Sequence, residues 1–363
     1  VCDEAVKLAK KRKFQSLQGY VNGVLRTVVR QKEQIVYPDK QTSYIEYLSV
    51  YYSMPVWLVE HFCNAYGENA CEKILQSYMT RGAVGIRLQE TAGLKQREEL
   101  IELWRQAGVQ VSRHPYLPYA VEVQKTDGIH SLAGFAEGLF AVQDVSSMLV
   151  VEAAGIQQGD TVIDVCAAPG GKAMHAAEKL AGTGQVIACD VSSYKTDKIR
   201  ENTQRLRMTN VSVREQDARV RDKTLIGQAD VLIADVPCSG LGVIGKKQDI
   251  KYRVTKESLE DIVRLQKEII ANVVHYLKQD GVMMYSTCTM NPAENDKMAA
   301  WICREYDMEP ESMADMMPKE LKEAAKRGMI QLLPGVHETD GFFIARLRRK
   351  RRNTSDAAQN EDA

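Results

Sequence analysis

The sequence predicts an α/β protein whose core is a doubly wound, Rossmann-like sheet, preceded by a small α+β module and an all-α segment. The second half of the chain alternates short apolar strands with amphipathic helices, and a glycine-bearing turn follows the first of these strands. The first quarter carries helical apolar spacing only. The 363 residues suffice for two to three domains. We expect domains at 1–83, 84–140 and 141–350, and a disordered tail at 351–363.

Composition excludes several classes of protein. The chain is 44% hydrophobic and 26% charged, so it is not disordered as a whole. Lys+Arg and Asp+Glu are 48 each, so any surface that binds nucleic acid must be local. Eight Cys without a CxxC pair indicate neither a disulfide framework nor zinc, and we expect reduced thiols, no metal and a cytoplasmic location. No apolar run approaches the ~18–20 residues of a membrane span, so we expect no membrane partner.

The N-terminal segment is expected to be helical. Leu17, Tyr20, Val24 and Val28 recur at spacings of three and four, which places them on one helix face. Over residues 1–40, nine Lys and Arg stand against four acidic residues. This excess fits either a solvated helix face or a patch that faces phosphates. The chain opens without Met and already in helical period, so we expect it to begin inside this domain.

The next segment predicts a small βαββ module. Strands are expected at Val84–Leu88, Val109–Val111 and Ala120–Val123. An amphipathic helix is expected at Gln96–Ala107, with Gly108 after it. Periodicity alone does not indicate what this module does.

The remaining segment alternates strands and helices, which predicts a parallel sheet. The helix Ser258–Leu277 has a continuous apolar face, and we expect Gly281 to stop it. The basic run that begins at Arg346 fits a solvated end of the chain as well as an RNA contact. Strands are expected at Thr161–Val165, Gln185–Asp190, Val211–Val213, Val231–Ala234 and Val282–Ser286.

The first chemical motif runs from Asp164 to Lys172 and reads DVCAAPGGK. A buried strand leads into a glycine-bearing turn and then a helix, which presents backbone N–H groups and a helix N-terminus to a ligand. The motif is not the GxGxxG of dinucleotide enzymes. Asp190 ends the next strand and can accept hydrogen bonds from ribose hydroxyls, and Asp217 can meet an adenine edge. Each acid alone could be a strand-end cap, but the set in this order predicts a nucleoside cofactor.

Two cysteines follow predicted strands of the sheet. Cys238 stands in Asp235-Val-Pro-Cys, and Cys288 stands in Ser-Thr-Cys-Thr. Ligands of open α/β sheets bind at the carboxyl ends of the strands, so both thiols are expected at one crevice. A lone Cys is usually a small buried hydrophobe. Two at strand ends, one of them beside Asp-x-Pro, predict covalent activation of an electrophilic ring by a thiolate.

These motifs resemble those of a known family. DVCAAPGGK, DVPCSG and STCT followed by Glu294 are similar to motifs of the RNA 5-methylcytosine methyltransferases, which use S-adenosylmethionine. The segments 19–26 and 47–59 look like the late helices of a NusB-like domain in the ribosomal members. The resemblance implies a class I S-adenosylmethionine-dependent methyltransferase core, an RRM- or ferredoxin-like module, and a partial NusB-like RNA-binding domain. It also implies 16S rRNA as the substrate.

The resemblance implies roles for individual residues. Cys288 is the nucleophile, Cys238 assists release of the covalent product, and Asp235 holds N3 and the exocyclic amine of cytosine close to the cofactor. The base that removes the C5 proton is not identified. The implied cofactor site comprises Cys166, Ala167, Ala168, Pro169, Gly170, Gly171, Lys172, Asp190, Asp217 and Asp235. The basic residues Lys246, Lys247, Lys251 and Arg253 are expected to contact RNA, with a solvated loop as the alternative.

Other functions stay open at this point. A tRNA substrate is the alternative within the same chemistry. An RNA-binding assembly factor without catalysis would fit the basic N-terminal segment. An NAD-dependent dehydrogenase would fit the sheet but leaves both cysteine motifs unexplained. We expect the protein to be a monomer.

Overall fold

The computed structural model describes residues 2–80, 82–126 and 128–350. The tail expected to be disordered, 351–363, lies outside the described residues. The described chain divides into two compact units between Val59 and Glu60. Every helix within the described ranges is too short or too polar to cross a bilayer.

The first unit is helical, as the apolar spacing predicts. It contains α1 (Cys2–Lys11), α2 (Gln18–Gln31), α3 (Tyr44–Tyr51) and the start of α4 (Val56–Tyr66). The stripe of Leu17, Tyr20, Val24 and Val28 lies at one helix and its entry turn, and these side chains are 44–72% exposed. Neither α1 nor α2 buries a residue, so the stripe does not form a core within the described unit.

The second unit begins with helices and a small antiparallel sheet. Helix α5 (Glu68–Ser77) precedes the sheet, whose strand order is β2-β3-β1-β4. One helix, α6 (Gly93–Gln106), packs on the sheet and buries Leu100, Ile101 and Trp104 against it. The predicted βαββ pattern is confirmed, and β4 is an additional strand that pairs with β1. The strands are β1 (Val84–Leu88), β2 (Gln110–Arg113), β3 (Ala120–Gln124) and β4 (Phe140–Val142).

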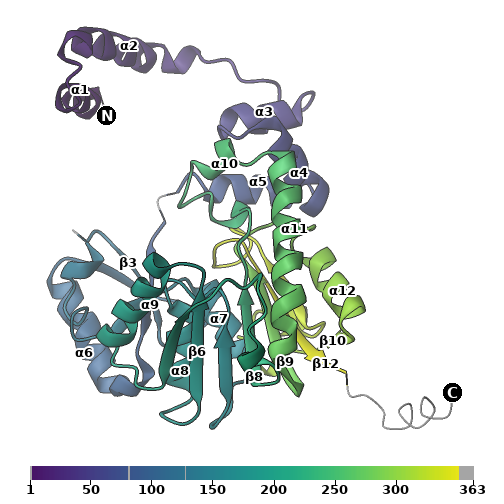
Figure 1. The fold of residues 1–363 in the computed structure, drawn as a ribbon. Coiled ribbons are helices and arrows are strands. Elements are labelled where there is room, and N and C mark those ends of the chain that lie inside the picture. Colours follow the sequence, from purple (N-terminus) through teal and green to yellow (C-terminus); the bar gives the residue numbers. More distant parts are fainter. Residues whose placement is uncertain (1, 81, 127, 351–363) are drawn as a thin grey trace, which may run out of the picture. The chain divides into compact units, whose positions relative to one another are not determined.

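The larger sheet has the order β10-β12-β9-β8-β5-β6-β7, with β11 paired to β12 (Figure 1). The five strands from β9 to β7 are parallel, and β12 runs antiparallel to β9. The strands are β5 (Thr161–Asp164), β6 (Gln185–Asp190), β7 (Val211–Glu215), β8 (Ala229–Asp235), β9 (Leu277–Thr287), β10 (Met308–Pro310), β11 (Met329–Leu332) and β12 (Phe342–Arg349).

Helices cover both faces of this sheet, as a doubly wound fold requires. One core layer takes side chains from α7, α8 and α9, and the other takes them from α11 and α12. Each layer is a continuous cluster of buried apolar residues. The helices are α7 (Val145–Ala154), α8 (Gly171–Lys179), α9 (Ser193–Arg205), α10 (Ile250–Arg253), α11 (Lys256–Val273), α12 (Asp296–Glu305) and α13 (Lys322–Ala325).

The predicted helix Ser258–Leu277 is wrong at its C-terminal end. Helix α11 stops at Val273, and Leu277 already pairs with Ala229 as the first residue of β9. Apolar side chains at 273–277 continue the helical period, but the sheet takes the last of them. Gly281 lies inside the strand, where an added Cβ would come within 2.8 Å of the Ala229 carbonyl oxygen. Gly281 therefore permits the close approach of β9 to β8.

A buried ion pair fixes the small sheet to the larger one. The Arg87 guanidinium of β1 contacts the Glu178 carboxylate of α8, and both side chains are almost fully buried. The Nε of Arg87 also donates to the Gln143 side chain at 2.8 Å. Removal of either charge would leave the other buried without a partner, which is costly. Arg87 and Glu178 therefore hold the small module against the helix that begins at the glycine-bearing turn.

The basic residues near the C-terminal end of β12 form hydrogen bonds and ion pairs with neighbouring elements. Arg346 and Arg348 of β12 both donate to Glu311, and Arg346 also donates to the carbonyl of Ala153 at the end of α7. Arg349 donates to the carbonyl of Val274 at 2.8 Å. The described part of the run therefore joins neighbouring elements.

Candidate active site

The first motif forms the predicted strand–turn–helix. Strand β5 ends at Asp164, and α8 begins at Gly171. Gly170 has a φ of 107°, which L side chains rarely adopt, so glycine is required there. The turn is held from the next strand, because the Asp190 carboxylate accepts from Ala168 N at 2.9 Å. The geometry expected of this turn is present.

The two acids expected at a nucleoside lie at one cavity. Asp190 ends β6 and is paired with the Lys195 ammonium at 2.9 Å. Asp217 follows β7 and accepts from the Arg219 guanidinium at 2.6 Å. The cavity has a volume of about 220 Å³, and Cys166 and Pro237 also line it. Pro237 belongs to the second motif, so the cavity reaches from the first motif to the second.

The residues at this cavity fit a nucleoside cofactor with an amino group. Val191, Ala218 and Ile269 offer apolar contact for a base, and the carboxylates of Asp190 and Asp217 offer acceptors for hydroxyl or amino groups. Asp164 is fully buried, and its Oδ1 has no hydrogen-bond partner within the described residues. Burial raises the pKa of Asp164 to about 7, although the Lys172 ammonium opposes this.

The two predicted thiols are in contact. The Sγ atoms of Cys238 and Cys288 lie 3.3 Å apart, and both residues are partly exposed. The contact follows from the sheet, because Asp235 at the end of β8 pairs in parallel with Ser286 of β9. Cys238 comes three residues after the first, and Cys288 two residues after the second. The sheet therefore brings together two side chains that are distant in the sequence.

The contact makes the two thiols unequal. The hydrogen bond from the Cys238 sulfur lowers the pKa of Cys288, with further lowering by the positive charges of Lys172 and Lys247. The same hydrogen bond, together with burial, raises the pKa of Cys238. Cys288 is therefore the more acidic of the two thiols, and Cys238 is the less acidic one.

Asp235 connects the cofactor turn with the thiols. Its Oδ2 accepts from the Lys172 ammonium at 2.5 Å, and its Oδ1 accepts from the Ser286 hydroxyl at 2.8 Å. The carboxylate is thus held between α8 and β9, two residues before Pro237, which lines the cofactor cavity. Its side chain is 27% exposed, so an incoming group can still reach it.

A buried carboxylate supports the turn that carries Cys238. Glu294 is fully buried and accepts four hydrogen bonds. Its Oε2 accepts from the backbone N–H of Ser239 at 2.9 Å and from Gln266 at 3.0 Å. Its Oε1 accepts from the Ser239 hydroxyl at 2.5 Å and from Asn291 at 3.0 Å. Three segments thus converge on one carboxylate beside the thiol pair.

Gly242 holds the loop after Cys238 against the loop after β9. Its N–H donates to the carbonyl of Cys288 at 3.0 Å, and its carbonyl accepts from Gly341 N at 2.9 Å. An added Cβ would lie 1.9 Å from the carbonyl oxygen of Gly341, so only glycine fits.

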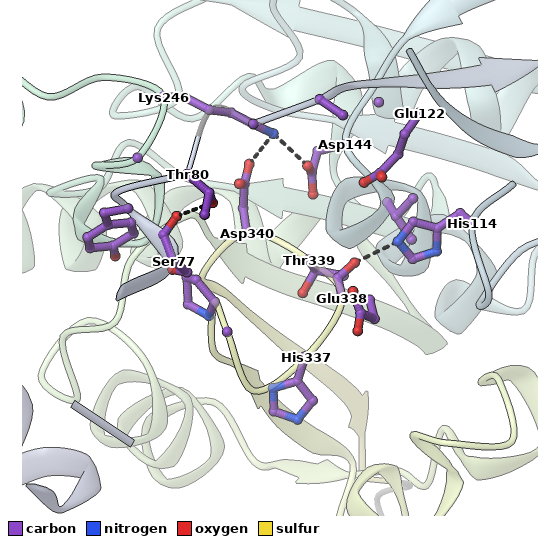
Figure 2. A pocket seen from close by; sticks show the side chains of 18 residues that line it. Ser77, Thr80, His114, Glu122, Asp144, Lys246, His337, Glu338, Thr339 and Asp340 are labelled. Atoms are coloured by element: carbon purple, nitrogen blue, oxygen red, sulfur yellow. Dashed lines mark hydrogen bonds and ion pairs between the residues drawn. The ribbon is translucent and has the colours of Figure 1, made fainter. Parts of the chain in front are cut away.

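Lys246, one of the residues expected to contact RNA, makes two ion pairs within the protein. Figure 2 shows its ammonium between Asp144, at 2.8 Å, and Asp340, at 2.6 Å. These groups line a second cavity of about 200 Å³. Burial and the Asp144 charge raise the pKa of Asp340 to about 7. Lys246 therefore joins α7, its own loop and the loop at Asp340, and its contact with RNA stays a prediction.

Lys247, Lys251 and Arg253 are the other three residues that were expected to contact RNA. Lys247 is exposed, and its charge reaches Cys288 strongly enough to lower the thiol pKa. Lys251 and Arg253 belong to the short helix α10, with the Lys251 ammonium 5.1 Å from the ring centre of Tyr252. Arg253 pairs with Asp249 at 3.3 Å, and both are exposed. Their RNA contacts also stay predictions.

Comparison with known proteins identifies the family. Residues 152–348 match the family model described as 16S rRNA methyltransferase RsmB/F. The chain belongs to this RsmB/F family. Residues 54–130 match the ferredoxin-like domain of RsmF/B-like methyltransferases. The family resemblance read from the motifs and the expected class I methyltransferase core are confirmed, and the cofactor of this RsmB/F member is S-adenosylmethionine.

Individual RsmB/F relatives cover most of the chain. A protein of Bacillus subtilis named probable ribosomal RNA small subunit methyltransferase B is 34% identical over 96% of this chain and 77% of its own length. A ribosomal RNA small subunit methyltransferase B of Klebsiella pneumoniae is 32% identical over the same shares. The crystal structure of PH0851 has a TM-score of 0.81 and 25% identity, over 95% of this chain and 76% of its own.

A second solved structure shares the fold. NSun6 from Pyrococcus horikoshii, solved with SFG, has a TM-score of 0.69 and 24% identity, over 81% of this chain and 98% of its own.

Several residues of the site were not assigned a role from the sequence. Glu294 was part of a quoted motif, yet its partners Ser239 and Gln266 come from other segments. One signal was available: Gln266 is a polar residue within the helix face that is otherwise apolar. The sharp steric requirement at Gly242 has no sequence signal, because Gly341 approaches it only in the folded chain.

Proposed function

We propose that this RsmB/F member transfers a methyl group from S-adenosylmethionine to C5 of a cytosine in 16S rRNA, in the cytoplasm. The observation that carries the proposal is the 3.3 Å contact between the Cys238 and Cys288 sulfurs beside the cofactor cavity. The names of the curated relatives supply the RNA class, small-subunit ribosomal RNA. Both thiols are partly exposed, so a base that is flipped out of its stack could contact them.

Cys288 supplies the nucleophile that the base requires. C5 of cytosine is a weak nucleophile, but addition of a thiolate to C6 gives the ring an enamine character and makes C5 reactive. S-Adenosylmethionine supplies an electrophilic methyl group when it is bound. The hydrogen bond with Cys238 lowers the pKa of Cys288, and the Lys172 and Lys247 charges act in the same direction, which favours the thiolate form at Cys288 over Cys238. Cys288 therefore bonds to C6 before C5 acquires the methyl group.

Cys238 assists release of the product. After methyl transfer, C5 loses its proton, and the C6–S bond breaks with its electron pair returning to the Cys288 sulfur. A thiol at 3.3 Å can donate a hydrogen bond to that departing thiolate. The raised pKa of Cys238 keeps it protonated for this role. Asp235, fixed by Lys172 and Ser286, would hold N3 and the exocyclic amine of the base.

The assignment of the nucleophile is tested with Cys288→Ala. We expect loss of tritium transfer from labelled S-adenosylmethionine to 16S rRNA, with cofactor binding retained by calorimetry. The matched control is Cys303→Ala, which removes a partly buried free thiol on α12 and should leave transfer intact. Transfer at the normal rate by Cys288→Ala would overturn the assignment.

The same assay separates the alternative functions. An assembly factor without catalysis would bind RNA and show no transfer with the intact chain. A tRNA enzyme would label tRNA and leave 16S rRNA unlabelled. Bisulfite sequencing of rRNA from cells that lack the protein would identify the cytosine, since only a methylated cytosine resists conversion.

A further inference from the structure

Glu294 is a charged residue beside the thiol pair, and the proposed reaction gives it no role. It is fully buried, and no cation pairs with it within the described residues. A buried carboxylate without a cation is costly unless hydrogen bonds satisfy it. Glu294 accepts four, two of them from Ser239, the residue next to Cys238. Because two of the four bonds come from the turn that carries Cys238, Glu294 is placed to act on the thiol pair.

The hydrogen bonds of Glu294 fix the backbone of the Cys238 turn. Ser239 is held through its N–H and its hydroxyl, and the hydroxyl also lies 2.6 Å from that of Thr289. Gln266 donates to Glu294 at 3.0 Å and to the carbonyl of Pro237 at 2.9 Å. The residues on both sides of Cys238 are therefore tied to one carboxylate. Thr289 is the residue after Cys288, so the same network holds both cysteine loops.

The charge of Glu294 acts on the Cys238 sulfur. It raises the pKa of this thiol, after the larger effects of the Cys288 hydrogen bond and burial, and Asp235 acts in the same direction. Tyr285 of β9 is a further titratable group of this network, and its hydroxyl donates to the backbone carbonyl of Glu294 at 2.6 Å. The cations Lys172 and Lys247 act on Cys288 instead. The Asp235 charge is offset by its contact with Lys172, whereas Glu294 forms no ion pair among the residues that the structure describes.

We propose that Glu294 is the positioning residue of the release step: it holds the Cys238–Ser239 turn against the Cys288 loop, so that the Cys238 thiol can donate to the Cys288 sulfur. The proposal rests on the proposed function for its catalytic consequence only. The position and protonation of Cys238 can be measured without RNA or cofactor.

The first measurement is the pH dependence of Cys238 alkylation by iodoacetamide, in a Cys288→Ser background. Mass spectrometry of the Cys238 peptide gives the rate. We expect Glu294→Gln to move the midpoint down by about one pH unit, because a like charge beside the thiol has been removed. Glu294→Asp keeps the charge and should restore the midpoint. Glu311→Gln is the control. Glu311 follows the edge strand β10 and pairs with Arg346 and Arg348 of β12.

The second measurement is release, made with Cys288 intact. We expect Glu294→Gln to accumulate a covalent RNA adduct on denaturing gels, several-fold above the wild-type level, while cofactor binding is unchanged. A merely structural role would lower stability without moving the alkylation midpoint. Should Glu294→Gln fail to fold, Gln266→Lys places an ammonium beside the Glu294 carboxylate and should lower the midpoint in the same direction.

The outcomes separate the two proposals. Unchanged alkylation midpoints in both variants would overturn the role of Glu294, whatever the RNA assays show. A shifted midpoint without an adduct, in a chain whose wild type methylates RNA, would overturn the release role. If the wild type itself transfers no methyl group to RNA, the proposed function fails, while the alkylation result still decides whether Glu294 controls Cys238.

Discussion

The sulfur atoms of Cys238 and Cys288 lie 3.3 Å apart although 50 residues separate them in the chain. The contact is a consequence of strand order, because β8 and β9 are adjacent and parallel and each thiol follows the end of its strand. Their shared hydrogen bond makes one sulfur the better nucleophile and the other the better donor. This inequality is the chemical basis of the proposed mechanism.

The stability of the chain should depend on pH through Asp164. Its folded-state pKa is raised to about 7 from an ordinary value of 3.8, chiefly by burial. Between these values the folded state binds more protons than the unfolded state, so the free energy of unfolding falls as pH rises through this window. Asp164→Asn does not titrate. We expect the variant to gain stability relative to wild type between pH 5 and pH 8, in urea titrations without cofactor.

The control for that experiment is Asp197→Asn on α9, where the carboxylate is exposed. Its stability relative to wild type should change little between the two pH values. A constant difference between Asp164→Asn and wild type across this range would show that Asp164 is ionised in the folded chain.

The buried pair between Arg87 and Glu178 should contribute strongly to stability. Arg87→Met leaves the Glu178 charge buried without its cation, which costs about 3–5 kcal/mol by comparison with other broken buried pairs. Arg264→Met removes a cation from an exposed pair with Asp261 and should cost under about 1 kcal/mol. Chemical denaturation of both variants measures the difference. Equal losses would mean that the Arg87 pair does not hold the small sheet in place.

The two neighbouring lysines of the loop after Cys238 should behave differently. Lys247→Ala removes an exposed charge, so we expect weaker RNA binding and a slope of log affinity against log salt reduced by about 0.7–0.9. Lys246→Ala leaves Asp144 and Asp340 facing each other, so we expect a lower melting temperature instead. Filter binding at several salt concentrations and thermal unfolding give the two readouts. The reverse pattern would contradict the placement of Lys246.

The local features of the site and the meeting of the two thiols were predictable, and the network around Glu294 was not. The strand end at Asp190 follows from the apolar run, and the ends at Asp164 and Asp235 lie within one residue of the predicted ones. The parallel sheet then predicts that the thiols share an edge. The role of Glu294 depends on donors from two other segments, those of Ser239 and Gln266, which no spacing rule relates. The early end of α11 was missed for a similar reason. Leu277 pairs with Ala229 of β8, a distant segment, and this pairing overrides the helical period.

The most direct test of the mechanism is the covalent adduct of Cys238→Ala. The variant is incubated with 16S rRNA and S-adenosylmethionine, digested with nuclease and protease, and analysed by tandem mass spectrometry. We expect the peptide that contains Cys288 to carry a cytidine nucleotide with one added methyl group, because release is slowed after transfer. Methylated RNA without any nucleotide on Cys288, or with the nucleotide on another residue, would contradict the account.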